Sequence, residues 1–394
     1  MNINDKDIVL SYPKRSPIGK FKGSLADLNA HEITSQVIND IMTSSKLEKN
    51  RIDYVILGNV LSYGQGMNPA KKSAIGAGLP ENIIAYNVNQ VCGSGLQAII
   101  QGHNTLLADP NKIILAGGQE SMSNATHTIN LRKSTHLGDS TFVDTLVNDG
   151  LTCSINNIHM GLTVEHLADK YNISREMQDN YSMNSHIKAK QAQLDNVFED
   201  EISKIKVIKK KQEHMFTHDE HIRDQDSLNT LDHLRPAFSK TGTITAGNAS
   251  GINDAAAVML ISTYKNATDN GLKVFGKIKA ISCVGSDPME MGIAPIHAST
   301  DALKKAGWSV KDLDLIECNE AFAASSIIVD NEMKWDKAIV NVNGGSIALG
   351  HPIGASGARI LVTMLHEMEK RDAKKGLCTV CIGGGMALAL CIER

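Results

Sequence analysis

The sequence is poor in aromatic residues and in net charge, and it has no long apolar run. Aromatic residues make up 4% of its 394 residues, and the formal net charge is -3 at pH 7. A nucleic-acid-binding surface normally carries strong positive charge, so this composition argues against one. No apolar run approaches the roughly 20 residues of a membrane-spanning helix. We therefore expect neither nucleic acid nor membrane as a partner.

The sequence also lacks the signatures of export and of a disulfide framework. The polar, acidic residues 1–7 predict neither a secretory signal nor an arginine-rich transit peptide. The seven cysteines are an odd number scattered through a long chain, which predicts reduced thiols. We expect a cytoplasmic protein with two or three domains of ordinary size.

Residues 87–96 place a cysteine between a predicted strand and a predicted helix. A short apolar run of strand type precedes this stretch, and apolar residues recur at helical spacing after it. Gly93 and Gly95 allow positive φ angles and keep bulky side chains away from Cys92. The positive end of a helix dipole lowers a thiol's pKa and can stabilise a nearby oxyanion. This position favours a nucleophilic Cys92 over an inert, buried cysteine.

Strand-like and helical patterns alternate through residues 1–122 and again from residue 246 to the end. This alternation predicts an α/β fold with a mostly parallel sheet. Residues 123–245 are more polar and less regular, although Ser174 is a plausible N-cap for a helix that continues to Leu194. We expect this segment to be an insertion lying over the sheet.

The insertion contains one basic run, with lysines at positions 204, 206, 209, 210 and 211. The favoured interpretation is a solvated strand edge. The alternative is a contact for an anionic ligand such as a nucleotide phosphate.

The second half of the chain repeats the first. Three pairs of segments match in order and approximate spacing: 52–59 with 313–319, 87–89 with 341–343, and 116–118 with 382–386. Two copies of one α/β unit are therefore expected. Such a duplication would bring the turn that holds Cys92 close to its counterpart at 344–357.

That counterpart follows a predicted strand at 338–342 and precedes a helical pattern. His351 lies there between Gly350 and Pro352, which favours a catalytic base over a surface histidine. The glycines could instead cradle a phosphate, but the Lys-Ser/Thr ending of a P-loop is missing.

Cys378 and Cys381 form a C-x-x-C pattern. In a strand their sulfurs would point to opposite faces, and no second cysteine or histidine pair has ligand spacing, so a zinc or redox site is not expected. Cys381 stands at the end of its strand, before 383–385, where a sulfur lies beside free backbone N–H groups. Asn319 ends the other repeated strand and adds an amide donor to the same rim.

Four segments together resemble the signatures of the thiolase family. They are Asn-Val-Asn-x-Val-Cys-Gly-Ser-Gly at 87–95, Asn-Glu-Ala-Phe-Ala at 319–323, Gly-His-Pro-Ile-Gly-Ala-Ser-Gly-Ala-Arg at 350–359 and Cys-Ile-Gly-Gly-Gly at 381–385. The resemblance covers essentially the whole chain. The tripeptide at 159–161 is similar to that of the short-chain branch, the acetyl-CoA acetyltransferases.

The resemblance implies a fold of duplicated α/β units in a layered αβαβα core. The N-terminal half would comprise 1–122 with 246–270, and the C-terminal half 271–394. Residues 123–245 would form an inserted α+β loop domain over the active site.

The family pattern also assigns roles to individual residues. It makes Cys92 the acylated nucleophile, His351 the base that deprotonates it, and Cys381 the group that shuttles the second proton. Two oxyanion sites are implied because two thioester carbonyls gain charge. One consists of the backbone N–H groups of Cys92 and Gly383, and the other of His351 with a water held by Asn319.

By the same resemblance, coenzyme A lies against the insertion. Ser250 would hydrogen-bond the pantetheine, and Phe238 and Phe322 would flank it. The residues implied to contact coenzyme A or the acyl group are Leu151, His159, Met160, Phe238, Ala246, Ser250, Met291, Ala321 and Phe322. For the phenylalanine and methionine positions, plain core packing is the alternative.

The implied activity is the condensation of two acetyl-CoA molecules to acetoacetyl-CoA and CoA, and the reverse thiolysis. Coenzyme A and its thioesters are substrates and products here, and no metal or redox cofactor is implied. The alternatives are a longer-chain 3-ketoacyl-CoA thiolase of fatty-acid breakdown, a non-catalytic CoA-binding scaffold and a C-x-x-C redox protein. Departures from the family pattern at Cys153, Cys318 and Ala387 remove no catalytic group.

Similar enzymes also imply a homo-oligomer, a tetramer built as a dimer of dimers. Residues 123–145 would help to pair the dimers. The sequence does not determine which direction of the reaction runs in the cell.

Overall fold

The computed structural model describes residues 3–132 and 137–394, and a ten-stranded sheet forms the centre of this part. Its strands are β1 (Ile8–Arg15), β2 (Gly19–Lys20), β3 (Tyr54–Gly58), β4 (Ile84–Val88), β5 (Ile113–Ser121), β12 (Asn253–Thr263), β13 (Val274–Gly285), β14 (Leu315–Cys318), β15 (Lys375–Ile382) and β16 (Met386–Glu393). Their order is β14-β15-β16-β13-β1-β12-β5-β3-β4, and β2 pairs with β12. Strands from both halves of the chain therefore meet where β1 pairs with β13.

The prediction of a mostly parallel sheet was wrong. Parallel pairing joins only β14 to β15, and β3 to both β4 and β5. Every other pairing in the described sheet is antiparallel. The long strands β12, β13 and β16 create these contacts, and β15 returns to β16 through a hairpin turn. Strand β12 pairs with β1 and β5, which lie far away in the sequence. The residues of a strand do not by themselves indicate the direction of such a distant neighbour.

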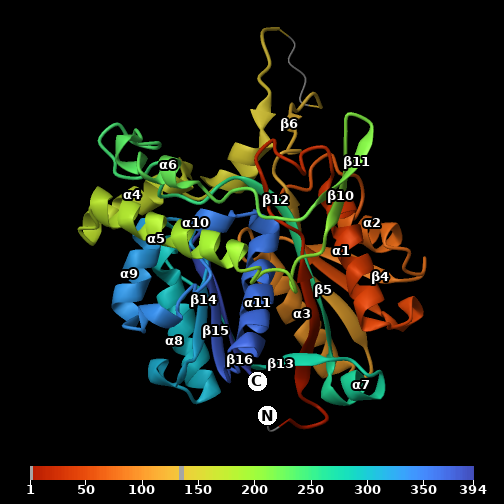
Figure 1. Cartoon of the computed structure of the whole chain (residues 1–394). Coiled ribbons are helices and arrows are strands. Elements are labelled where there is room, and N and C mark those ends of the chain that lie inside the picture. Colours follow the sequence, from red (N-terminus) through yellow and green to blue (C-terminus); the bar gives the residue numbers. More distant parts are fainter. Residues whose placement is uncertain (1–2, 133–136) are drawn as a thin grey trace.

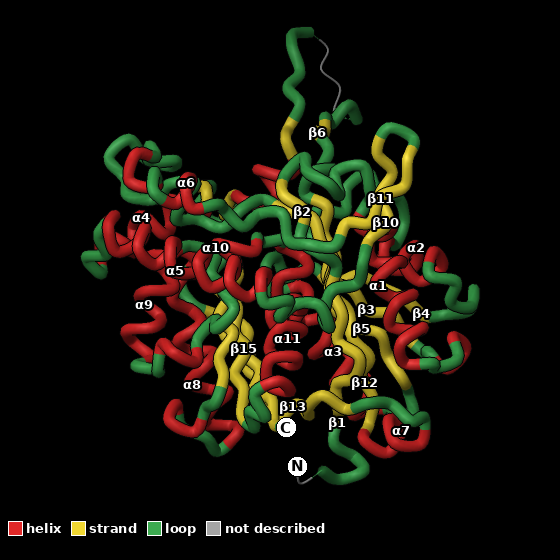
Figure 2. The backbone as a smooth tube through the Cα atoms, in the orientation of Figure 1, coloured by secondary structure: helices red, strands yellow, loops and turns green. Residues whose placement is uncertain are grey.

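Helices cover both outer faces of the sheet and fill the space between its two halves, which gives five layers, αβαβα (Figure 1). The helices α1 (Ala30–Ser45) and α2 (Pro69–Gly76) lie outside the N-terminal half, and α8 (Ala294–Ala306) and α9 (Ala323–Met333) outside the C-terminal half. Between the halves lie α3 (Ser94–Ala108) and α11 (Ile353–Lys370), visible in Figure 2 as red helices flanked by yellow strands.

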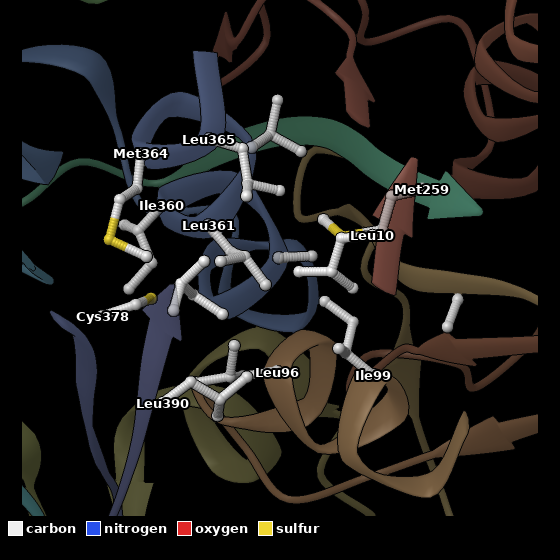
Figure 3. Packing of buried hydrophobic residues seen from close by; sticks show 14 of the residues in the cluster. Leu10, Leu96, Ile99, Met259, Ile360, Leu361, Met364, Leu365, Cys378 and Leu390 are labelled. Carbon is white, nitrogen blue, oxygen red and sulfur yellow. The ribbon is translucent and has the colours of Figure 1, made fainter. Parts of the chain in front are cut away.

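Helix α11, in the middle layer, is almost entirely buried. Every residue from Ile353 to Met368 of α11 is buried, because α3 and strands of both halves surround it. Figure 3 shows Leu361 of α11 among side chains from both halves, including Leu10 and Leu96. The two helices approach closely: a Cβ atom added to Gly95 would lie 2.9 Å from the backbone nitrogen of Ala358. Gly95 is therefore required by the packing of α3 on α11.

The described residues of the insertion, 123–132 and 137–245, form helices and short strands that lie over one end of the sheet (Figure 1). They are β6 (His127–Thr128), β7 (Val143–Asp144), a π-helical segment (Leu146–Leu151), β8 (Thr152–Cys153), β9 (Ile158–His159), α4 (Met160–Lys170), α5 (Arg175–Leu194), β10 (Ile205–Lys209), β11 (Gln212–Phe216) and α6 (Gln225–Leu228). The predicted helix after Ser174 is confirmed as α5, and the Ser174 side chain accepts a hydrogen bond from the Met177 backbone nitrogen.

The lysine run forms a hairpin of β10 and β11, and all five of its lysines are exposed. Buried Ile205 and Val207 alternate with exposed Lys206 and Ile208 along β10, as in a half-buried strand. The interpretation as a solvated strand edge is confirmed.

The short connecting elements complete the described chain. They are α7 (Tyr264–Asp269), α10 (Ser346–Leu349) and 3-10 helices at Lys49–Arg51, Leu231–His233, Pro288–Ile293, Val310–Asp312 and Lys337–Ile339. No helix within 3–132 or 137–394 has the length and apolar character that crossing a membrane demands.

The two halves match less closely than the sequence repeat predicted. The strand expected at 338–342 is a 3-10 helix followed by a single bridge between Ile316 and Val340. Gly117 and Gly118 continue strand β5, whereas Gly384 and Gly385 have positive φ angles in the turn from β15 to β16. The letters alone make the two glycine runs look equivalent. Gly117 and Gly118 serve close packing, whereas Gly384 and Gly385 serve a tight turn.

Candidate active site

Cys92 lies on the turn that joins β4 to α3, as its sequence context predicted. The turn is closed by hydrogen bonds from the backbone nitrogen and the Oγ of Ser94 to the carbonyl oxygen of Val91, at 3.0 and 2.6 Å. The Oγ of Ser94 also accepts from the backbone nitrogen of Gln90 at 2.8 Å. Ser94 therefore holds the backbone on both sides of Cys92.

The expected positive φ angles fall on a different residue. Gly93 has a φ of -80° and Gly95 is helical, whereas Val91 has a φ of 46°. The glycines are needed for space: a Cβ atom on Gly93 would lie 2.3 Å from Cδ1 of Ile382. Val91 carries the backbone strain, since a β-branched residue rarely adopts this conformation.

His351 meets Cys92 across the interface between the two halves. Its Nε2 lies 3.3 Å from the Sγ of Cys92, so the turn at 344–357 does approach the Cys92 turn as the repeat predicted. The His351 backbone nitrogen donates to Oδ1 of Asn253 on β12 at 3.0 Å, which fixes the histidine from the N-terminal half. Gly350, with a φ of 113°, leaves room for that asparagine.

The hydrogen bonds of Ser356 determine which ring nitrogen of His351 carries the proton. Oγ of Ser356 donates to the carbonyl oxygen of Pro352 at 2.8 Å and lies 2.6 Å from Nδ1 of His351. The hydroxyl has one hydrogen, so it must accept at Nδ1, and Nδ1 must carry the imidazole proton. Nε2 is then a lone-pair acceptor facing the thiol of Cys92.

Burial keeps both members of this pair neutral. Although Cys92 is partly exposed, burial raises the pKa of its thiol to about 11, and the backbone N–H groups of Gly383 and Cys92 offset only part of this rise. Burial lowers the pKa of His351 to about 4. The expectation of a lowered thiol pKa was therefore wrong, although the backbone N–H groups act in the expected direction. Loss of hydration outweighs the helix dipole here.

Cys381 and Gly383 complete the surroundings of the nucleophile. Cys381 ends β15 on the face that packs with Met160 and Met291, whereas Cys378 belongs to the separate cluster around α11. Burial, followed by repulsion from Cys92, raises the pKa of Cys381 to about 12. Because the N–H groups of Gly383 and Cys92 both point at the sulfur of Cys92, an oxygen bonded to a carbon on that sulfur can reach the same donors.

Asn319 directly follows β14, the strand that pairs with the Cys381 strand β15. Its Oδ1 accepts a hydrogen bond from Oγ of Ser346 at 2.6 Å, and its Nδ2 is buried without a partner in the described part of the chain. A buried amide N–H without a partner costs free energy unless a ligand or water completes it.

A cavity of about 500 Å³ contains Cys92, His351 and Cys381 and is also lined by residues of the insertion. The predicted residues that line it are Cys92, Leu151, His159, Met160, Phe238, Ala246, Ser250, Met291, Ala321, Phe322, His351, Cys381 and Gly383. Asn319 alone among the predicted site residues is absent from this lining. His159 stacks on Phe238 with ring centroids 4.6 Å apart, and Phe238 meets Phe322 edge-on at 6.1 Å.

Three basic side chains in the lining of this cavity were not predicted. Lys20, His221 and Arg223 contribute to its lining, and none of the lysines between 204 and 211 does. The phosphate-contact alternative for that lysine run is therefore not supported. Lys20 and Arg223 carry no pattern of their own in the sequence, because they come from the two-residue strand β2 and from an irregular part of the insertion.

The side chains that fix the positions of Cys92 and His351 were also not predicted from the sequence. Ser356 stands five residues after His351 in the quoted motif, so its position was a usable signal, but Asn253 comes from a distant strand. Glu120 of β5 accepts hydrogen bonds from the backbone nitrogens of Val60, Leu61 and Gly354, which ties both halves together beside the cysteine. Within the described residues no cluster of three side chains could hold a metal ion.

Family models and curated relatives match nearly the whole length of this chain. The family model described as "Thiolase, N-terminal domain" matches residues 8–265, and the one described as "Thiolase, C-terminal domain" matches residues 272–394. The chain is 48% identical to an acetyl-CoA acetyltransferase of Paracoccus denitrificans, over 96% of this chain and 97% of that protein. It is 45% identical to one of Rhizobium meliloti, over the full length of both.

Solved structures show the same fold. The acetyl-CoA acetyltransferase of Bacillus anthracis superimposes with a TM-score of 0.95 and 37% identity, covering 98% of each chain. Human mitochondrial 3-ketoacyl-CoA thiolase gives the same TM-score and identity, covering 99% of each. A duplicated αβαβα core with two cysteines and a histidine in one cavity is the arrangement of an acyl-transferring enzyme. The chain belongs to the thiolase family.

The pKa values predict a neutral resting pair across the physiological range. Between about pH 4 and about pH 11, Cys92 should be a thiol and His351 a neutral imidazole. The ultraviolet difference spectrum between the wild type and Cys92→Ser should show no thiolate band at pH 7, and the band should grow only as the pH rises toward 11. Cys283→Ser, which removes an exposed thiol, is the control. A full thiolate band for Cys92 at pH 7 would contradict the prediction.

Proposed function

We propose that the protein is an acetyl-CoA C-acetyltransferase, which condenses two acetyl-CoA molecules to acetoacetyl-CoA and CoA and catalyses the reverse thiolysis. The observation that carries the proposal is the contact of Cys92 with Nε2 of His351 in a cavity that also contains Cys381 and the Gly383 backbone. Relatives at 45–48% identity with the name acetyl-CoA acetyltransferase support the choice of substrate.

In the first half of the reaction, Cys92 takes an acetyl group from acetyl-CoA. Nε2 of His351 accepts the thiol proton while Sγ attacks the thioester carbon, and the N–H groups of Cys92 and Gly383 stabilise the oxyanion. The bond from carbon to the sulfur of CoA then breaks, and the imidazolium returns the proton to that sulfur. A thioester on Cys92 remains.

In the second half, the acetyl group moves to the methyl carbon of another acetyl-CoA. The Cys381 thiol first passes its proton to the imidazole of His351, and the Cys381 thiolate then removes a methyl proton. The resulting enolate carbon attacks the acetyl-cysteine, the bond from carbon to Sγ of Cys92 breaks, and the imidazolium returns its proton to Cys92. A thiol with a pKa near 12 becomes a strong base once deprotonated, as removal of a proton from carbon requires. The Nε2–H of the His351 imidazolium and a water held by Asn319 stabilise the enolate oxygen, which accounts for an asparagine outside the cavity lining whose Nδ2 has no partner among the described residues.

The remaining cavity residues serve coenzyme A and the acyl group. Ala246 and Ser250 would contact the pantetheine, which Phe238 and Phe322 would flank. Leu151, His159, Met160, Met291 and Ala321 would contact the acyl end, and all of these residues line the cavity. The reaction uses only the thiol, imidazole and amide groups named here together with the two thioesters, so coenzyme A and its esters are substrates and no further cofactor takes part. We place the protein in the cytoplasm, where acetyl-CoA and CoA are its small-molecule partners.

Replacing Cys381 should separate the two half-reactions. Cys381→Ala should still form an acetyl adduct on the Cys92 peptide, detectable by mass spectrometry after treatment with acetyl-CoA. It should lower acetoacetyl-CoA formation by about 10²- to 10⁴-fold, the usual contribution of a general base.

Cys378→Ala is the matched control, since its sulfur points away from the cavity on the same strand, and it should retain activity. Absence of the adduct in the wild type would refute the enzyme in favour of a CoA-binding scaffold. Loss of activity in Cys378→Ala would instead favour the redox alternative.

Met160 should limit the length of the acyl chain. Its Sδ would lie only 3.2 Å from a Cβ atom added to Gly383, so the side chain closes the cavity beside the nucleophile. The wild type should cleave acetoacetyl-CoA in preference to 3-ketooctanoyl-CoA, and Met160→Ala should shift that ratio toward the longer substrate by about tenfold or more.

Met177→Ala, on α5 and outside the cavity lining, is the control for removing a methionine side chain. A wild-type preference for 3-ketooctanoyl-CoA would instead identify a thiolase of fatty-acid breakdown.

A homotetramer built as a dimer of dimers is the proposed assembly, with residues 123–145 pairing the dimers. Residues 133–136 of this segment lie outside the described part. Its described residues include four large apolar side chains that are exposed in the single chain: Leu131, Leu137, Phe142 and Val143. Such exposed apolar groups gathered in one segment are typical of a protein contact. Sedimentation velocity should give a tetramer, a Leu137→Asp/Phe142→Asp variant should give a dimer, and a wild-type monomer would refute the proposal.

A further inference from the structure

A buried serine connects the amide of Asn319 with a buried guanidinium. Oγ of Ser346, at the first residue of α10, lies 2.6 Å from Oδ1 of Asn319 and 2.9 Å from Nη2 of Arg359 on α11. All three residues are nearly inaccessible to solvent, with exposed fractions of 3% or less. The contact therefore joins the end of β14, the start of α10 and the second turn of α11, outside the cavity lining.

The chemistry of these three groups leaves one direction for the hydrogen bonds. A guanidinium can only donate, so Oγ of Ser346 accepts from Arg359 and must use its single hydrogen toward Asn319. The atom of Asn319 that receives this hydrogen is then the carbonyl oxygen Oδ1. The amide is held with Nδ2 turned away from Ser346, and this Nδ2 has no partner among the described residues.

Arg359 gives its one described hydrogen bond to Ser346. Nε and Nη1 have no hydrogen-bond partner in the described part of the chain, and the nearest carboxylate oxygen, on Glu317, is 3.7 Å from Nη1. A buried cation is costly, and packing in the core would be served better by an apolar residue of similar size. Its placement is explained if the direction of its hydrogen bond matters to the site.

We propose that Ser346 is a positioning residue for the second half of the reaction, and that Arg359 fixes the direction of its hydroxyl. An amide oxygen and nitrogen differ little in shape, so without Ser346 the Asn319 side chain could turn its oxygen toward the water of the oxyanion site. The amide would then take a hydrogen from that water instead of donating to it, which makes the water a weaker donor to the enolate oxygen. This inference rests on the proposed function, in which Asn319 holds the water of that oxyanion site.

The two oxyanion sites make the inference testable. The acetyl-cysteine carbonyl uses the N–H groups of Cys92 and Gly383, so exchange of acetyl groups between acetyl-CoA and labelled CoA needs no contact with Asn319. Cleavage of acetoacetyl-CoA forms an enolate and needs that amide. Loss of Ser346 should therefore impair thiolysis and leave acetyl exchange intact.

Ser346→Ala should lower kcat for acetoacetyl-CoA thiolysis by about 10- to 100-fold, approaching the loss of one oxyanion donor. Its acetyl exchange should match that of Ser299→Ala, a control that removes another fully buried hydroxyl, on α8. Ser346→Cys, which keeps the size and a weak donor, should lose less thiolysis activity and also keep the exchange. Equal losses in both reactions would show a merely structural role and overturn the inference.

A double-mutant cycle tests whether Ser346 acts through Asn319. In an Asn319→Ala background, the further change Ser346→Ala should cause no additional loss of thiolysis. A full additional loss would overturn the inference while leaving the proposed function in place. A wild type without acetyl exchange would overturn the proposed function itself, so the two failures are distinguishable.

Discussion

The close packing of α3 on α11 is the contact on which the site depends. Gly95 of α3 meets Gly354 and Ala358 of α11 at distances that a side chain would block. Both helices therefore begin at the same end of the molecule, and the turns before them hold Cys92 and His351. The 3.3 Å contact of sulfur and imidazole is the geometric result of two backbones in near contact. Asn253 and Glu120 then tie the same turns to the sheet.

Desolvation, more than the helix dipole, determines the charge of the resting site. A helix end contributes about 1 kcal/mol to a nearby charge, and burial of a single ionised group costs several times as much. The cysteine and the histidine therefore remain neutral until a substrate carbonyl can share the charge. The tautomer fixed by Ser356 keeps an acceptor facing the thiol, so the proton has a short path. A neutral thiol is also less open to oxidation than a thiolate.

Features determined by short stretches could be predicted from the sequence. The turn around Cys92, the position of His351 and the end of strand β15 at Cys381 follow from local periodicity and glycine placement, and the repeat predicted that the first two meet. Strand direction could not be predicted, since β12 and β13 acquire their antiparallel neighbours from distant parts of the chain. The same holds for Asn253 and for the link from Arg359 through Ser346. The thiol pKa was missed because burial is a property of the assembled fold.

Helix α11 belongs to the C-terminal half, yet much of its buried surface faces α3 and the strands of the N-terminal half. A C-terminal half made alone would leave one side of this helix in water and would expose Leu361 and Leu365. Each half thus completes the other's interior, as a partner subunit would. If the chain arose by duplication of one unit, the ancestral unit would have needed a second copy of itself to cover that helix.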